Sequence, residues 1–314
     1  MARYIGRRLL QIIPTLLGVF TIVFILTDLM PSDPLRAMLG EQYRQLSPQA
    51  AENFRQQLGL NDPFMVRYIR LLGQVIQGNL GRSYILDQNV SDIIAYRFPR
   101  TLELMAGALI TAIMIGLPVG LLGAHYVNSW FDHFLTLATL TIVSIPIFWL
   151  AVIAQLLLTQ ATSGVALLPV AGYEEGNFAY LILPSLLLGM SLAAGIARIT
   201  RAALLEVQTQ DYITVAKAKG LPFYLVVWRH QLRNALMPIL TVIALDISSL
   251  MTGSIIIETV FNWPGLGRAL VPAIERQDTP VITGILLFGA FLFIVVNLLT
   301  DVLYTIIDPR IRYT

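Results

Sequence analysis

Six Lys and Arg residues lie in the segment 198–233 of a chain that is otherwise mostly apolar. They surround a short stretch with clear signals for a helix. Asp211 is a suitable N-cap, and Gly220 is the residue type expected directly after a helix end. Lys217 and Lys219 lie near that end, where the helix dipole favours cations. The sequence therefore predicts a capped basic helix, whose chemistry is recognition of another surface rather than bond making.

The predicted helix, Tyr212 to Lys219, has one face of small residues. Ile213, Ala216 and Gly220 share this face at helical spacing, and its two small residues would allow another protein to approach closely. This pattern favours a docking helix for a cytoplasmic partner. The alternative interpretation is a basic loop that only orients the chain and lies on anionic lipid headgroups.

A second group of polar residues lies in an apolar stretch further along the chain. Asp246 falls in the middle of this stretch, with Ser249 and Gly253 one and two helical turns on. An Asp at the centre of a membrane helix costs about 3 kcal/mol on insertion scales, so it usually faces a cavity or a partner. We expect these residues to line a substrate pathway, with Glu258 at an external gate. An interhelical hydrogen bond is the alternative role for Asp246.

Several kinds of chemistry are excluded or disfavoured by what the sequence lacks. The chain has no cysteine, which excludes disulfides, cysteine-bound zinc and thiol catalysis. It also lacks the G-x-x-x-x-G-K-[ST] pattern that cradles ATP phosphates, and no catalytic pair or metal-ligand spacing is present. We therefore expect no catalytic or metal site and no cofactor bound by this chain.

The composition is that of an integral membrane protein. Of 314 residues, 56% are hydrophobic and 13% are charged, with a mean hydropathy of +0.71. A soluble domain carries roughly 25% charged residues. The formal net charge is only +2, so no global basic field points to nucleic acid.

Six stretches are long and apolar enough to cross a bilayer, which takes roughly 20 residues per helix. The sequence therefore predicts an all-α membrane protein with six transmembrane helices. Prolines interrupt most of the six, and membrane helices tolerate them where neighbouring groups satisfy the freed carbonyls. The predicted spans are residues 9–30, 102–125, 134–158, 178–200, 235–257 and 281–303.

The distribution of Lys and Arg in short loops predicts the orientation. With the amino terminus inside, the cytoplasmic side holds Arg3, Arg7, Arg8, the six cations of segment 198–233, Arg310 and Arg312. The short outside loops hold only Arg268 and Arg276. Both termini are therefore expected in the cytoplasm.

The segment 31–100 is expected to be a small helical excursion on the outside. Two helices are predicted from start signals followed by a glycine stop. A third short helix is expected to lead into the second span through Pro99. The signals are Ser47-Pro48 with Gly59, Asp62-Pro63 with Gly78, and a start at Ser91 or Asp92.

The basic stretch resembles the EAA loop of ABC-importer permeases, in the version found in the dipeptide/oligopeptide/nickel family. That version typically reads T-A-R-A-K-G-[LV], followed by R-H-x-L-R-N-A-x-x-P. Residues 215–221 read V-A-K-A-K-G-L, and residues 229–235 read R-H-Q-L-R-N-A before Pro238. One departure is Asp278-Thr279-Pro280, where the family usually has Asp-Tyr-Pro.

The resemblance extends over nearly the whole chain. Further matching segments are 31–34 (P-S-D-P), 58–60 (L-G-L) with Pro63, 78–81 (G-N-L-G), Glu258, Phe261, 263–267 (W-P-G-L-G) and 308–313 (D-P-R-I-R-Y). It implies a type I ABC importer permease fold in a bacterial cytoplasmic membrane. Residues 1–30 would form the amino-terminal anchor and first span, residues 31–100 the external segment, and residues 101–314 a five-helix core with a coupling loop at about 198–234.

The resemblance also implies partners and roles. The chain would form half of a translocation pore with a homologous second permease, most plainly for di- or oligopeptides. Two cytoplasmic ATPases, which would hold ATP and Mg, and an extracytoplasmic binding protein would complete the assembly. The residues implied in ATPase coupling are Asp211, Tyr212, Val215, Ala216, Lys217, Ala218, Lys219, Gly220 and Leu221.

Two other functions are compatible with a polytopic membrane protein. An ion-driven secondary carrier would often show internal repeats and broken helices at the midplane, whereas the sequence shows one buried Asp and no repeat. An intramembrane enzyme would need a catalytic pair, which the sequence lacks. The carrier remains the main alternative to an ATP-driven importer.

Overall fold

The computed structural model describes residues 2–30, Leu35, Tyr43, and residues 45–57, 59–161 and 168–307. They belong to two compact units. The first unit comprises Met1–Arg100 and Pro264–Val295, and the second comprises Thr101–Trp263 and Val296–Thr314. The matching segments 31–34 and 308–313 lie outside the described residues, as do Leu58 and the side chain of Asp301.

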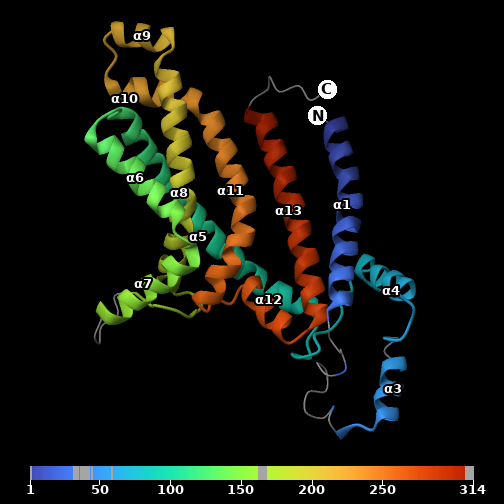
Figure 1. The fold of residues 1–314 in the computed structure, drawn as a ribbon. Helices are drawn as coiled ribbons and strands as arrows, with labels where there is room; N and C mark the ends of the chain where they lie inside the picture. The colour runs from blue at the N-terminus through green and yellow to red at the C-terminus, as the bar shows by residue number, and fades with distance from the viewer. Residues whose placement is uncertain are drawn as a thin grey trace. The chain divides into compact units, whose positions relative to one another are not determined.

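The described part of the chain is helical, and its only extended pairing is an isolated bridge between Arg82 and Asn89. This confirms the predicted all-α class. Figure 1 shows the helices in chain order. They are α1 (Ala2–Leu29), α3 (Pro48–Gln57), α4 (Phe64–Ile76), α5 (Val90–His125), α6 (Trp130–Ser144), α7 (Ile147–Ala161), α8 (Ala179–Gln208), α9 (Asp211–Ala218), α10 (Phe223–Leu225), a π-helix (Val226–Gln231), α11 (Leu232–Val260), α12 (Leu266–Glu275) and α13 (Thr279–Ile307).

Five helical segments in the described residues are long and apolar enough to cross a membrane, and a sixth candidate is broken. The predicted span over 134–158 is this broken one, in which α6 and α7 meet at an angle of 100°. Ile145 between them is extended, with φ −89° and ψ 126°. Proline disfavours the α conformation in the residue before it, so Pro146 explains the break. The five unbroken segments are Leu10–Leu29, Val90–His125, Ala179–Gln208, Val226–Val260 and Thr279–Thr300.

The expected short third helix of the external segment is also not separate. The structure has one helix, α5, that runs through Pro99 without a break. Pro99 removes one backbone hydrogen bond of the helix. Residues on both sides of it, such as Ile94 and Leu104, are buried. The packing of the segments on both sides therefore outweighs the tendency of proline to end a helix.

The other two helices predicted in segment 31–100 are present as α3 and α4. The Ser47 hydroxyl caps α3 by accepting a hydrogen bond from the Ala50 amide at 3.2 Å. Gly59 and Gly78 follow α3 and α4 with positive φ angles of 64° and 77°. Glycine adopts this left-handed conformation without the steric cost that a Cβ brings.

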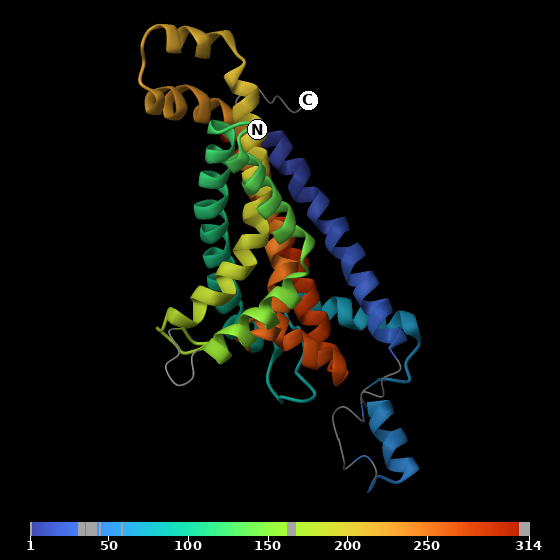
Figure 2. The same ribbon diagram turned by 60° about the vertical axis from the view of Figure 1, so that its left-hand side comes forward.

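In the first unit, α4 lies beside α1, as Figures 1 and 2 show from two directions, and aromatic rings pack between the two helices. The Tyr68 ring contacts Phe20 and Phe24 edge-on, with centroid distances of 5.2 and 5.3 Å. Its hydroxyl forms a 2.8 Å hydrogen bond with Thr21. An ion pair of 2.6 Å between Arg67 and Asp28 completes the contact.

In the second unit, small residues bring α5 and α8 into close contact. A Cβ placed on Gly120 would lie 2.6 Å from the Ala197 carbonyl oxygen, and one on Gly116 would lie 2.8 Å from that of Ala193. Such approaches are typical of membrane helices that pack through small side chains. The helix α8 is thereby fixed against α5, and it leads directly to the predicted docking helix.

Candidate functional site

The predicted docking helix exists as α9, and it lies across the end of α8 with α10 returning beneath it (Figures 1 and 2). Its first helical residue is Asp211, and the N-cap is Gln210, which is extended at φ −77° and ψ 143°. The prediction of Asp211 as N-cap is therefore wrong by one residue, and the Gln210 side chain makes no capping hydrogen bond. In the first turn, the Asp211 carboxylate still interacts favourably with the helix dipole.

The carboxyl end of α9 has the predicted glycine stop. Gly220 has φ +74°. Its amide donates to the Lys217 carbonyl at 3.0 Å, and the Leu221 amide donates to the Ala216 carbonyl at 3.4 Å. These two bonds form a Schellman motif, which satisfies carbonyls that the helix end leaves open. Four of the residues implied in ATPase coupling thus take part in one hydrogen-bonded turn, which fixes their backbone.

The small-residue face of α9 packs inside the chain. Ile213 is 0% exposed and Ala216 is buried, and both lie in a cluster with Val226 and Val207. The prediction that this face meets another protein is therefore wrong for Ile213 and Ala216. The physical reason is that the chain doubles back after Gly220 and brings Val226 over the face. Sequence periodicity identified a contact face correctly but assigned it to an external partner.

The opposite face of α9 is open. Val215 is 52% exposed and Tyr212 is 43% exposed, and Leu221 follows at the glycine turn with 36%. Exposed aromatic and aliphatic side chains on a short rigid helix are typical of a protein contact. The remaining implied coupling residues, Asp211, Lys217, Ala218, Lys219 and Gly220, are also exposed.

The return from α9 passes through a π-helix that the sequence analysis did not predict. It covers Val226–Gln231 and includes the Arg229-His230 pair of the family pattern. π-Helices are rare and occur often at functional sites. Val226 at its start covers α9, and Gln231 at its end is buried. The match to the family pattern singled out this segment, but none of its residue types indicates a π-helix.

An ion pair between α6 and α8 was also missed. The Arg201 guanidinium binds the Asp132 carboxylate with two hydrogen bonds of 2.7 Å, from Nε and Nη2. Asp132 is buried, and its carboxylate also accepts a 3.0 Å bond from the Asn128 amide. Ser129 caps α6 through the Asp132 amide. The S-x-x-D spacing of these two residues was the available signal.

The four residues predicted to line a pathway do not share one environment. Asp246 on α11 is half-buried, and its Oδ2 atom has no hydrogen-bond partner among the described residues. Ser249 is exposed one turn on, and Gly253 is partly buried beside Leu188. Glu258, in contrast, is 0% exposed and accepts a 2.7 Å hydrogen bond from the Thr101 hydroxyl. Its part in an external gate stays a prediction.

Asp246, Ser249 and Gly253 thus form a polar, small stripe on α11 that other parts of the second unit leave partly open. A carboxylate in a membrane-spanning helix is costly unless it meets water or another polar group. That the stripe lines a substrate pathway stays a prediction, as does the alternative of an interhelical hydrogen bond for Asp246.

Apolar spans and an exposed, capped helix at the end of α8 are features of a membrane subunit that works with other proteins. The chain belongs to the family of binding-protein-dependent transport system inner membrane components, whose profile matches residues 116–313. The profile for the amino-terminal part of such membrane components matches residues 1–105. The protein is accordingly a multi-pass permease of an ABC importer in the inner membrane.

Individual relatives match over full length. The chain is 39% identical to the dipeptide transport system permease protein DppB of Escherichia coli strain K12, covering 100% of this chain and 99% of that protein. It is 40% identical to the glutathione transport system permease protein GsiC of Salmonella paratyphi A, with 100% of each covered. Among solved structures, an inward-facing MetNI methionine ABC transporter matches with a TM-score of 0.55 and 21% identity, over 69% of this chain and 96% of that one. This likeness confirms the type I importer permease fold.

Proposed function

We propose that this chain forms half of the translocation pore of an ATP-driven peptide importer, and that α9 receives the movement of a cytoplasmic ATPase. The observation that carries the proposal is the two-sided character of α9. One face is fixed within the chain by Val226 and Val207. The other face presents Tyr212 and Val215 outward.

A helix that transmits force must be held on its own side of the contact. In α9, the buried cluster and the Schellman turn at Gly220 supply this support. The Asp132–Arg201 ion pair fixes α8 against α6 about two turns before α8 ends. A push on Tyr212 or Val215 would therefore move α8 and α11 as packed elements.

The stripe of Asp246, Ser249 and Gly253 supports a pore shared with a second permease. Its partial exposure leaves room for a homologous subunit, and we propose a heterodimer with two ATPases and an extracytoplasmic binding protein. The chain would perform no bond chemistry itself. ATP and Mg would be held by the ATPase subunits, since this sequence has no phosphate-cradling motif.

A peptide substrate is supported by the names of the relatives, which include dipeptide, peptide and glutathione permeases. The substrates in these names differ in size and charge, although the relatives have similar sequence identities to this chain. The departure at Thr279 from the family's usual tyrosine leaves the permease role intact but argues against transferring one relative's substrate to this chain. We therefore propose small peptides as the substrate class.

The docking role is tested by a charge on the open face of α9. Val215→Glu should leave membrane insertion and the buried cluster intact, but the ATPase subunits should no longer co-purify and uptake should be lost. Val127→Glu is the matched control, because Val127 is also exposed, at 39%, in the short connection between α5 and α6. Full co-purification with Val215→Glu would contradict the proposal.

A further inference from the structure

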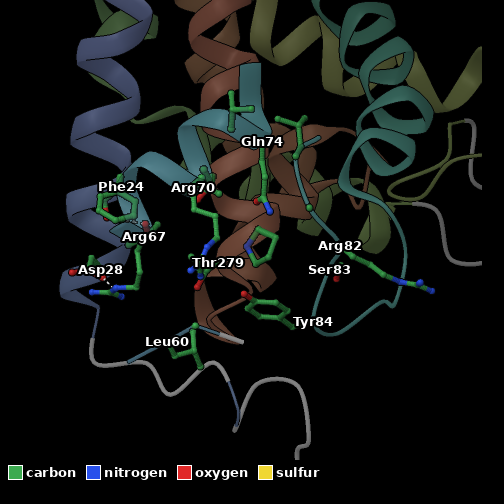
Figure 3. A pocket seen from close by; sticks show the side chains of 18 of the residues that line it. Phe24, Asp28, Leu60, Arg67, Arg70, Gln74, Arg82, Ser83, Tyr84 and Thr279 are labelled. Atoms are coloured by element: carbon green, nitrogen blue, oxygen red, sulfur yellow. Dashed lines mark hydrogen bonds and ion pairs between the residues drawn. The ribbon is translucent and has the colours of Figure 1, made fainter. Parts of the chain in front are cut away.

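A cavity of about 900 Å³ lies within the first unit, at the end of α1 that follows Phe24 (Figure 3). Its walls come from α1, α4, the segment 80–87 and the start of α13. Sites for small molecules typically have volumes of roughly 300 to 1,000 Å³. The cavity is therefore large enough for a solute of dipeptide size and much larger than one inserted side chain. In the predicted orientation, it opens on the extracytoplasmic side.

Four arginines line this cavity, and a carboxylate pairs with each of them. Arg67 pairs with Asp28 and Arg82 with Asp87, both in the lining, whereas Arg55 pairs with Glu52 and Arg70 with Asp62. Figure 3 shows Arg70 extending from α4 toward the space that Tyr84 also borders, whereas Arg67 turns toward Asp28 on α1. Guanidinium groups match the planar geometry of a carboxylate with two parallel donors.

Two polar atoms of the lining are buried and have no hydrogen-bond partner among the described residues. They are Nε of Arg67, whose Nη1 pairs with Asp28, and Oγ1 of Thr283. Thr283 is only 4% exposed. Buried polar groups are normally paired, so these two donors remain available to a ligand.

A second hydroxyl, that of Tyr84, remains a donor across the ordinary pH range. Burial, and then the charge of the neighbouring Asp278, raise the pKa of the Tyr84 phenol above its usual value of 10.0. Asp278 is fixed in place because its carboxylate accepts hydrogen bonds from the Ser83 hydroxyl and the Tyr84 amide. The lining of the cavity thus combines cationic and neutral hydrogen-bond donors, and hydrogen bonds to Asp278 hold the segment with Tyr84 in place.

We propose that this cavity binds a small peptide by its carboxylate, with the Arg67 guanidinium and the Thr283 hydroxyl as the anchoring donors. It is a site on the permease itself, separate from the stripe on α11. The proposal rests on the proposed function only for the choice of a peptide as the ligand. The Asp28 and Asp87 carboxylates disfavour a doubly charged anion, so a single carboxylate suits the cavity better than phosphate.

The first test measures binding of the dipeptide Ala-Ala to the complete membrane complex in nanodiscs, without nucleotide and without the binding protein. Saturable binding is expected, and Ala-Ala amide should bind about tenfold more weakly, because it loses a charge-assisted hydrogen bond. Equal binding of the amide, competition by inorganic phosphate as strong as that by Ala-Ala, or an absence of binding would overturn the proposal.

The second test separates ligand binding from structural support by the Arg67–Asp28 ion pair. Arg67→Gln and Thr283→Val should each weaken Ala-Ala binding about tenfold. Asp28→Asn breaks the same ion pair but frees Arg67 and removes a repelling charge, so Ala-Ala should bind at least as tightly. If Arg67→Gln and Asp28→Asn weaken binding alike, the ion pair only supports the fold and the proposal fails.

ATP-driven uptake distinguishes this proposal from the proposed function. Proteoliposomes with the binding protein should take up peptide with the unaltered chain. If uptake is intact while Ala-Ala does not bind the complex alone, the cavity proposal fails and the importer function stands. If uptake requires no ATP, the proposed function fails, whereas carboxylate-specific binding that depends on Arg67 would still support the cavity site.

Discussion

The Asp132 carboxylate on α6 receives both hydrogen bonds of a bidentate pair from Arg201 on α8. Because Asp132 is almost completely buried and Arg201 is about a third exposed, the pair lies between a surface and an interior ion pair. Removing one partner of a buried pair costs about 3 to 5 kcal/mol, and exposed pairs contribute about 1 kcal/mol or less. We expect Arg201→Gln to lower the free energy of unfolding by an amount between these two values. It should also loosen the end of α8, where the chain leads into α9.

The measurement is thermal unfolding of the purified complex together with substrate-stimulated ATP hydrolysis. Arg201→Gln should lower both the unfolding temperature and the stimulation. Arg201→Lys keeps the charge but cannot donate two parallel bonds, so it should restore only part of the stimulation. Unchanged coupling in both variants would show that the pair does not position α9.

Gly220 provides a test of conformation alone. A Cβ at this position would meet no atom within 4 Å, so its positive φ of 74° is the only obstacle to substitution. The left-handed conformation costs roughly 1 to 2 kcal/mol for a residue with a Cβ, and Asn tolerates it best. Gly220→Val should therefore weaken ATPase co-purification, whereas Gly220→Asn should be close to the unaltered chain. Equal behaviour of the two variants would contradict the role of the turn.

The helix ends were predictable because their signals are local. Ser47, Gly59, Gly78 and Gly220 each act on backbone within a few residues, and all four are where the sequence placed them. Most span positions followed from long apolar runs for the same reason. The break at Pro146 was ambiguous, because membrane helices often contain proline without breaking.

The features that were missed depend on residues far apart in the chain. Asp132 and Arg201 are 69 positions apart. The cover over Ile213 and Ala216 is provided by Val226, which reaches them only because the chain reverses after Gly220. Helical periodicity shows that a face is in contact but does not show whether the contact is internal. Sequence reasoning therefore located the helix α9 but not which of its faces is exposed.

The predicted orientation is tested by single cysteines, since the natural chain has none. Gln45 and Lys219 are both exposed, in the external segment and at the end of α9. An impermeant thiol reagent on intact cells should label Gln45→Cys and leave Lys219→Cys unlabelled until the membrane is permeabilised. Labelling of Lys219→Cys from outside would invert the orientation.

The role of Asp246 is tested by removing its charge. Because Oδ2 of Asp246 has no partner among the described residues, Asp246→Asn should not disrupt packing, and the complex should assemble and hydrolyse ATP. Peptide uptake should change, since the stripe would lose its charged group. Loss of assembly would instead assign Asp246 to a structural contact between subunits.

The central claim, that the open face of α9 contacts an ATPase, is tested most directly by photo-crosslinking in the assembled complex. A photoreactive amino acid at Val215 or Tyr212, which are exposed, should form a crosslink to the ATPase subunit. The same group at Leu221 should give a weaker crosslink, and one at Phe178, which is exposed at the opposite end of α8, should give none. Crosslinks from Val215 and Tyr212 only to lipid, with the ATPases still bound, would contradict the account.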